Sequence, residues 1–408
     1  MNSITWTPFV RLWIGNTSSG LATWALPFVL GFAVLGGQLT SASLGVALAV
    51  RTLGFLIAMP ISGVLSDRSG PRPVIFASGI AGAAGLPIIF VGIFAGGQLT
   101  SLLLVVGAIV VGIGQGACRP AYQSIIPEIV PVEGLQAANA ALSISVRVTS
   151  IVGPALVGLI VLGPGIEIAF LVIAALWLTS ALAPPAGRTR RIDDGLPSVG
   201  KLTLGNIFHD FIEGAGEARR HPWFVTGLVC LTITIAAGYS VTAVLLPGIS
   251  QEVSGGASLM TATATSYMVG ALFGALLMAR WRPSNRGWVA LLGLCFYGLA
   301  PLSLLATETM VVPLAAYLVA GIGIEMFNVP WFTSIQNEIP QNRLSRVSSL
   351  DFLFSYGLAP LGLALMSPLT ETLGREVVLV GTGLLCLAGP AIAMCLPTVR
   401  RFSREPQT

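Results

Sequence analysis

This chain of 408 residues contains few charged residues. Asp, Glu, Lys and Arg make up only 9% of it, whereas an ordinary soluble domain has about 25%. Hydrophobic residues reach 54%, and long apolar runs recur along nearly the whole chain. Runs of about 18 residues or more are typical of membrane-spanning helices. The composition excludes a set of soluble domains and predicts an all-α protein that crosses the membrane many times.

Several motifs that carry chemistry are also missing. The five cysteines form no C-x-x-C pair, so neither a disulfide framework nor a zinc site is indicated. The two histidines, His209 and His221, both lie in the central loop, which excludes an intramembrane serine–histidine hydrolase or a metalloprotease. No G-x-x-x-x-G-K-[ST] motif occurs, so ATP at a P-loop does not drive the protein. We expect no enzyme, no metal site and no cofactor.

Twelve apolar runs predict twelve transmembrane helices. They cover residues 8–36, 40–65, 72–95, 99–127, 135–162, 165–183, 223–248, 257–281, 287–306, 309–336, 347–369 and 376–397. The longest break divides them six and six. We therefore expect two pseudo-symmetric six-helix bundles at 1–183 and 223–398, a linker at 184–222 and a tail at 399–408.

The linker itself falls into two parts. Residues 184–200 predict an exposed segment. Residues 204–220 predict an amphipathic helix at the inner membrane surface, whose apolar side carries Ile207, Phe208, Phe211 and Ile212. A brace between the two halves is the first interpretation of this helix, and a regulatory role is the second.

Basic residues alternate with the predicted spans. With both termini inside, 16 of the 21 Lys and Arg residues fall in inner segments and only Arg375 lies in an outer loop. This asymmetry predicts a multi-pass protein of the bacterial inner membrane with both termini in the cytoplasm. It leaves no continuous basic surface for a nucleic acid.

The two halves of the chain contain an internal repeat. When the first half is shifted along the sequence by 209 residues, Gly112 falls on Gly321, and Pro131 falls on Pro340. A parallel repeat of this kind predicts a transporter whose substrate binds between the two halves, near the middle of the membrane.

The loop between the second and third runs reads Gly63-Val-Leu-Ser-Asp67-Arg68-Ser-Gly70-Pro71-Arg72. It resembles the signature loop of the major facilitator superfamily, although Pro71 stands where that pattern has a basic residue. The resemblance implies a latch for one conformational state, in which Asp67 faces the start of the eleventh span near Val347 and the loop arginines pair with Glu128. A plain basic turn is the alternative. In the second half Arg280 stands near the place of the aspartate, so we expect the stronger latch in the first half.

Further stretches resemble the macrolide-efflux and enterobactin-exporter branch of the drug:proton antiporters in that superfamily. They begin at Pro120, Gly153, Glu217, Phe327 and Arg346. One of them resembles the glycine–proline motif of exporters and contains Gly153, Pro154 and Gly158, although such residues also serve ordinary helix packing. The resemblance implies the major facilitator fold and alternating access.

Four charged residues lie deep inside the apolar runs, away from their ends: Arg51, Arg119, Arg147 and Glu325. Because a charge at the bilayer centre costs about 2.5–3.5 kcal/mol, each must find a partner, water or a ligand. Arg51 and Arg147 are expected to pair within the first half or, alternatively, to contact the ligand. With Asp351 near the start of the eleventh span, arginine is still in excess, which indicates a cargo with an anionic or electron-rich group.

Glu325 is the candidate for proton coupling, because it is the only acidic residue deep in a run. Arg119 or a bound substrate would shift it between its protonated and ionised forms, which is the minimum chemistry for exchanging a proton against cargo. A permanent salt bridge with Arg119 and a contact to substrate alone are the alternatives.

The resemblance implies that spans 1, 4, 7 and 10 line the substrate cavity. Helical spacing puts Gln115, Arg119 and Tyr122 on one face of span 4, and Asn328 and Phe332 on one face of span 10. Further candidates for an aromatic lining of the cavity are Trp24, Tyr239 and Trp331, with ordinary packing or lipid contact as the alternative. We expect a monomeric exporter of small amphipathic molecules that works by proton antiport. A facilitator-type importer or uniporter and a membrane sensor that transports nothing are the alternatives.

Overall fold

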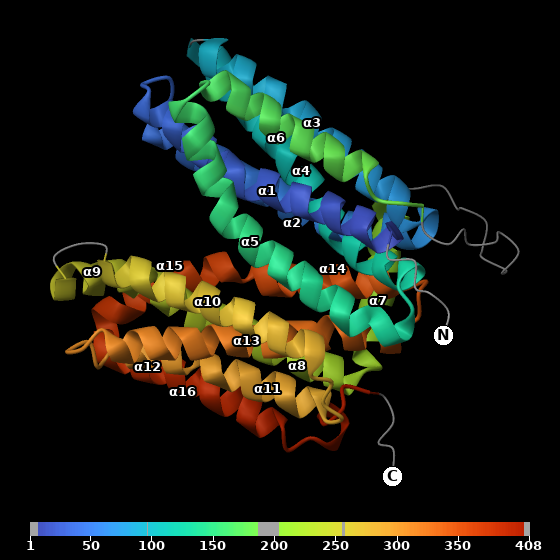
Figure 1. Cartoon of the computed structure of the whole chain (residues 1–408), viewed down its shortest axis with the longest axis vertical. Coiled ribbons are helices and arrows are strands. Elements are labelled where there is room, and N and C mark those ends of the chain that lie inside the picture. Colours follow the sequence, from blue (N-terminus) through green and yellow to red (C-terminus); the bar gives the residue numbers. More distant parts are fainter. Residues whose placement is uncertain (1–6, 96, 187–203, 255–257, 404–408) are drawn as a thin grey trace, which may run out of the picture. The chain divides into compact units, whose positions relative to one another are not determined.

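The computed structural model describes residues 7–95, 97–186, 204–254 and 258–403, and all regular secondary structure within these ranges is helical (Figure 1). The expected all-α fold is therefore confirmed. The first seven α-helices are α1 (Thr7–Leu35), α2 (Ser41–Ser69), α3 (Pro71–Ala95), α4 (Gly97–Ile129), α5 (Leu135–Leu162), α6 (Ile166–Leu182) and α7 (Leu204–Arg219). The 3-10 turn η1 (Val132–Gly134) precedes α5.

The second half starts with α8 (Pro222–Ile233), which passes through a turn of π-helix, η2 (Thr234–Tyr239), into α9 (Ser240–Ser254). The remaining helices are α10 (Ser258–Arg280), α11 (Arg286–Tyr297), α12 (Leu299–Ser303), α13 (Val311–Glu338), α14 (Leu344–Gly357), α15 (Ala359–Leu373) and α16 (Arg375–Ala393), followed by the 3-10 turn η3 (Pro397–Val399).

Eleven segments of the described chain are long and apolar enough to cross a membrane, and α6 is a shorter apolar helix. They match the twelve runs predicted from the sequence within a few residues; the run predicted at 309–336, for example, is the helix Val311–Glu338. The predicted amphipathic helix is α7. Residues 187–200 of the predicted exposed segment and the side chains of Ile207 and Phe208 lie outside the described part.

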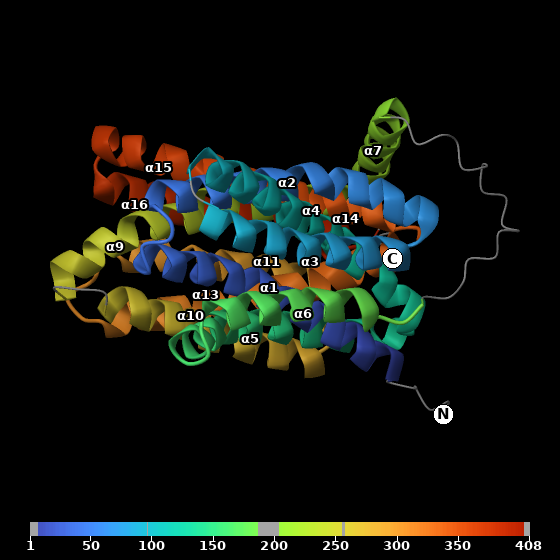
Figure 2. The same cartoon turned by 90° about the horizontal axis from the view of Figure 1, so that it is seen from above.

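The helices form two compact units. Unit 1 comprises Met1–Val132, Ser145–Ala215 and Pro340–Leu350, and unit 2 comprises Glu133–Ile144, Gly216–Ile339 and Asp351–Thr408. Each unit thus takes a short segment from a helix, α5 or α14, that continues in the other unit. In unit 1, α3 packs between α4 and α6 (Figure 1), and α7 lies at a steep angle to these helices (Figure 2).

The same helix crossing occurs in both units. In unit 1, a Cβ at Gly112 of α4 would lie 2.1 Å from the carbonyl oxygen of Arg51 in α2. In unit 2, a Cβ at Gly321 of α13 would lie 2.1 Å from the carbonyl oxygen of Tyr267 in α10. Only glycine lets two backbones approach so closely. Because Gly112 and Gly321 are equivalent positions of the predicted repeat, the internal repeat is confirmed.

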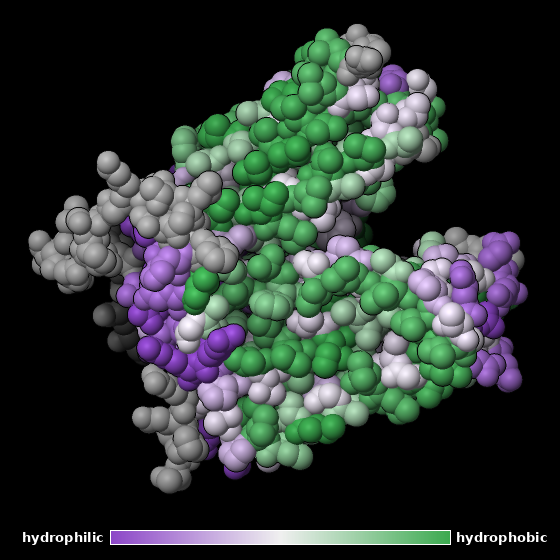
Figure 3. All heavy atoms as spheres, turned by 180° about the vertical axis from the view of Figure 1, so that it is seen from behind, coloured by the Kyte–Doolittle hydropathy of each residue, from purple (hydrophilic) through white to green (hydrophobic). Residues whose placement is uncertain are grey.

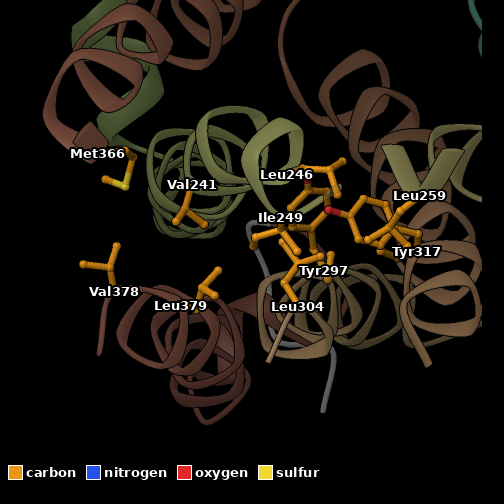
Figure 4. Packing of buried hydrophobic residues seen from close by; sticks show 12 residues of the cluster. Val241, Leu246, Ile249, Leu259, Tyr297, Leu304, Tyr317, Met366, Val378 and Leu379 are labelled. Atoms are coloured by element: carbon orange, nitrogen blue, oxygen red, sulfur yellow. The ribbon is translucent and has the colours of Figure 1, made fainter. Parts of the chain in front are cut away.

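Apolar side chains fill the units and also cover their sides. In unit 2 one buried cluster joins α9 and α10 to the helices that follow (Figure 4); it includes Val241, Leu246, Ile249, Leu259, Tyr297, Leu304, Tyr317, Met366, Val378 and Leu379. Many large apolar side chains nevertheless remain exposed along the helices, and hydrophilic residues gather toward the helix ends (Figure 3). Such an apolar exterior is what a lipid environment requires.

Candidate functional site

Asp67, the acid of the signature loop, binds the start of α14. Its Oδ1 atom accepts a hydrogen bond from the backbone amide of Ser345 at 2.9 Å, and its Oδ2 atom accepts one from the amide of Arg346 at 3.2 Å. The Nε atom of Arg346 donates to the same Oδ2 at 3.0 Å. The unpaired amides of a helix N-terminus carry partial positive charge and bind carboxylates well. The contact predicted between Asp67 and this helix is confirmed.

Two glycines of the same loop allow this geometry. A Cβ at Gly63 would lie 2.6 Å from the hydroxyl of Ser349 and 2.9 Å from the carbonyl oxygen of Ser345, so glycine lets α2 and α14 touch. Gly70 ends α2 with φ of +84°, a left-handed conformation that other residues adopt at a cost.

The amphipathic helix α7 adds two acids to this contact. Asp210 forms a salt bridge with Arg68. Glu213 accepts from Arg346 at 3.1 Å and from Arg343 at 3.2 Å. Neither acid was among the residues predicted from the sequence; their spacing of three residues on the polar side of a predicted helix was the signal that could have indicated a basic partner surface.

Arg72 of the signature loop does not form the expected ion pair with Glu128. Among the described residues, Arg72 forms no ion pair; its guanidinium group lies over the ring of Phe76, 5.9 Å from the centroid. Glu128 accepts a hydrogen bond at 3.3 Å from the side-chain amide of Gln341. The expected Arg72–Glu128 pair was wrong; the guanidinium group instead contacts the aromatic ring one turn along α3.

In unit 2, the start of α5 makes uncharged contacts that sequence reasoning also missed. The side-chain amide of Gln136 donates to the carbonyl oxygens of Met278 and Trp281, both at 2.6 Å. These carbonyls belong to the end of α10, where helix carbonyls lack intrahelical partners. Asn139, one turn further, donates to Gln336 at 2.8 Å. Single amide contacts of this kind leave no pattern in a sequence.

Glu325 is buried in the interior of unit 2, with 1% of its surface exposed. Its Cβ atom lies against α10, 3.1 Å from the position of a Cβ on Gly274. Asn328, one turn further along α13, is half-buried, and Phe332 stacks on Phe352 of α14 at 5.9 Å between centroids. The embedded carboxyl group is therefore shielded from lipid by its own unit.

The polar face of α4 in unit 1 contains both half-buried and fully buried residues. Gln115 and Arg119 are half-buried. Tyr122 is buried, and its hydroxyl group bonds the hydroxyl of Ser180 in α6 at 2.9 Å. Tyr122 therefore belongs to the packing between α4 and α6.

Trp331 of α13 is likewise an interior residue. Its ring is fully buried and stacks on Phe327 and Phe224 at 5.1 and 5.2 Å between centroids. Its Nε1–H group donates to Oδ1 of Asp351 in α14 at 2.9 Å. Asp351, which the sequence placed near a span entrance, is itself 1% exposed.

Two other aromatic candidates reach the surface of their units. Trp24 of α1 is 41% exposed, and Tyr239, the last residue of the π-helical turn η2, is 50% exposed. Turns of π-helix occur frequently at functional sites.

The remaining charged and motif residues lie in unit 1. Arg51 donates to the carbonyl oxygen of Thr23 at 3.4 Å, and Arg147 is half-buried. Gly153 packs against α1, since its Cβ would lie 3.0 Å from that of Trp24. Pro154 follows it inside α5, and no atom of the described chain lies within 4 Å of a Cβ at Gly158.

Known proteins resemble this chain over most of its length. The multidrug efflux pump Tap of Mycobacterium tuberculosis and of Mycobacterium bovis is 27% identical to it over 402 residues, which cover 95% of this chain and 92% of Tap. A bacterial homologue of the iron transporter ferroportin, in an outward-facing state, shares its fold with a TM-score of 0.75 and 17% identity, covering 95% of this chain and 98% of that one.

The human organic anion transporter MFSD10 is similar at a TM-score of 0.72 and 15% identity, covering 94% and 98% of the two chains. The family description of the Major Facilitator Superfamily matches residues 12–363. Its members are transporters and not enzymes. The helical fold, the repeat, the loop around Asp67 and these matches together show that the chain belongs to the Major Facilitator Superfamily and is a membrane transporter.

Proposed function

We propose that this transporter exports small amphipathic molecules by proton antiport, as a monomer in the bacterial inner membrane with both termini in the cytoplasm. The similarity to a multidrug efflux pump over 95% of the chain supports export. The observation that carries the proton coupling is the burial of Glu325 in the middle of α13. An ionisable group at such a place in a membrane protein is retained for function by default.

Glu325 would exchange its proton against cargo during alternating access. In the outward-open state, cargo leaves and the carboxylate takes up a proton from outside. In the inward-open state, cargo enters, the carboxylic acid releases its proton to the cytoplasm, and the carboxylate is ready for the next cycle. Arg119, which lies in unit 1, would favour the ionised form when it comes close, so a pairing of the two stays a prediction.

The substrate would contact the candidate residues whose side chains are half-buried or exposed. These are Gln115, Arg119, Asn328, Phe332, Trp24 and Tyr239. Tyr122 and Trp331 are left out, because the first is bonded to Ser180 and the second is enclosed by aromatic rings. The contact between Asp67 and the start of α14 would stabilise one state of the cycle, and the small residues Gly153 and Pro154 would shape α5 beside α1.

Transport into everted membrane vesicles tests this proposal. Ethidium and erythromycin serve as a cationic probe and a macrolide probe, under an imposed pH gradient with and without an uncoupler. We expect proton-driven accumulation in the parent protein. Glu325→Gln should abolish accumulation against a gradient but keep downhill exchange of the probe, since only proton release is lost.

A matched control converts an exposed carboxyl group, Glu371 on α15, to the amide. Glu371→Gln should accumulate the probes as the parent does. Uphill transport by Glu325→Gln at the parental rate would remove Glu325 from the coupling step. Accumulation inside intact cells would instead support the importer.

A further inference from the structure

Asp351 is a second buried carboxyl group, and the proposed mechanism leaves it without a role. It lies seven residues after the start of α14 and is 1% exposed. Among the described residues it forms no ion pair; its one hydrogen-bond donor is the indole Nε1–H of Trp331 at 2.9 Å. A buried carboxylate without a cation is costly, whereas a carboxylic acid at the same place carries no charge.

The donor to Asp351 is held in a fixed position. The indole ring of Trp331 stacks on Phe224 and Phe327, and Trp223 meets it edge to face at 5.7 Å. A Cβ at Gly227 of α8 would lie 2.2 Å from the ring, so the ring fills the space that this glycine leaves. The packing around Trp331 therefore fixes the position of the hydrogen bond to Oδ1 of Asp351.

Buried hydroxyl groups accompany Asp351 along the helix. Ser348 lies three residues before it and Ser355 four residues after it, so all three side chains share one face of α14. Both serines are buried, and neither hydroxyl oxygen has a hydrogen-bond partner among the described residues. The same is true of Ser334 on α13, one turn beyond Trp331. Buried polar atoms left unsatisfied in this way require an explanation.

Other titratable groups are engaged elsewhere or separated from Asp351. Arg346 on α14 is bonded to Asp67 and Glu213. Glu325 on α13 is six residues from Trp331, about 9 Å along the helix axis. His221 contacts the far ring, Trp223, at 6.0 Å and is paired with Glu217.

We propose that Asp351 is a second proton-binding carboxyl group of this transporter and that the buried serine hydroxyls of α14 carry protons to and from it. A hydroxyl group can accept one proton while it donates another, so these serines, once water links them to one another and to Asp351, would conduct protons where an apolar helix face does not. The row runs from the N-terminal end of α14 past Asp351. This inference deepens the proposed antiport and rests on it.

The variant Asp351→Asn distinguishes a proton-binding role of this side chain from a purely structural role as a hydrogen-bond acceptor. The Oδ1 atom of asparagine can still accept the hydrogen bond from Trp331, but the amide side chain cannot bind or release a proton at the pH values at which a carboxyl group does. If Asp351 binds protons, Asp351→Asn should fold like the parent on gel filtration and lose proton-driven accumulation of ethidium while it keeps downhill exchange. Ser355→Ala should slow proton-driven accumulation, and Glu371→Gln should change neither readout. Parental accumulation by Asp351→Asn would overturn the proposal.

Infrared difference spectroscopy gives a readout that does not depend on transport. Purified protein carrying Glu325→Gln is compared at acid and alkaline pH. Beside the bands of the exposed acids, we expect a carbonyl stretching band at the higher frequency typical of a protonated carboxyl group in an apolar site, and we expect this band to disappear when Asp351→Asn is added. If the band persists in the double variant, the proposal fails. If the band is lost but neither the parent nor any variant shows proton-driven transport, the antiport proposal fails while Asp351 remains a proton site.

Discussion

The end of α2 in unit 1 and the end of α10 in unit 2 are related by the internal repeat, yet they are held by different chemistry. Ser345 of α14 donates its backbone amide to the carboxylate of Asp67. Gln136, which the repeat places on Ser345, donates its side-chain amide to the carbonyls of α10. The same position of the repeat therefore makes the contact in both units, once to a charged group and once to neutral ones.

Helix length explains the difference. Beyond the shared crossing, α2 continues from Arg51 to Ser69, whereas α10 continues only from Tyr267 to Arg280 and is shorter there by more than one helical turn. The shorter α10 has no residue that could reach a neighbouring helix with a carboxylate, but it exposes carbonyl oxygens at its end. The side-chain amide of a glutamine carries two N–H donors and can bind two of them at once. The sequence predicted a weaker latch in the second half. This prediction can be tested, because the contact at α2 is charged and the contact at α10 is neutral.

Removing the charge of Asp67 should have the largest effect. Asp67→Asn removes the buried carboxylate from Arg346 and leaves it only the exposed Glu213 as an ionic partner, and breaking a buried pair costs about 3–5 kcal/mol. We expect a lower thermal unfolding midpoint in detergent and a loss of ethidium efflux. Adding Arg346→Gln should restore part of the stability, because no uncompensated charge remains. An unchanged midpoint in Asp67→Asn would contradict the importance of the charged contact.

Gln136→Leu should have an intermediate effect. It removes two hydrogen bonds to carbonyl oxygens, with a cost of about 1–3 kcal/mol. Because both partners are neutral, the loss should be the same at low and at high salt, as measured by thermal unfolding. Gln136→Glu is the sharper companion, since a carboxylate facing two carbonyl oxygens should destabilise more than leucine. Equal stability of all three proteins would show that the contact at α10 contributes nothing.

Glu213→Gln should have the smallest effect. Glu213 is exposed, and exposed ion pairs contribute about 0–1 kcal/mol. Its contacts to Arg343 and Arg346 should weaken further as salt screens them, so the variant and the parent should converge at high salt. The thermal unfolding midpoint as a function of salt concentration measures this. A larger loss than that of Asp67→Asn would mean that α7, and not the loop at Asp67, holds the start of α14.

Much of the fold could be predicted from the sequence. A bilayer imposes a fixed length of apolar chain, so that runs such as 309–336 agree with helices such as Val311–Glu338. The helices could be predicted because they depend on neighbours in sequence. The contact of Asp67 joins segments 278 positions apart and could be predicted only because the loop resembles the signature of the superfamily.

The contacts that could not be predicted join segments far apart in the chain. Gln136 binds residues more than 140 positions away, and Arg346 meets α7 across 133 positions. Helical spacing placed Tyr122 on the same face as Arg119, and Trp331 was a candidate because it is aromatic, but neither periodicity nor residue type says which neighbour a side chain meets. Both aromatic residues pack in the interior of their own units. The substrate cavity that they were predicted to line remains part of the proposal.

The π-helical turn between α8 and α9 contains one residue more than an α-helical turn needs. The carbonyl oxygen of Ala236 within it lies 2.2 Å from the position of a Cβ on Gly362, so α15 presses directly on the widened backbone. Tightening by a single residue would turn every side chain beyond Tyr239 by about 100° around the axis. A change in this π-helical turn can therefore rotate α9 and change which of its side chains face a given neighbour, while α8 (Pro222–Ile233) does not move.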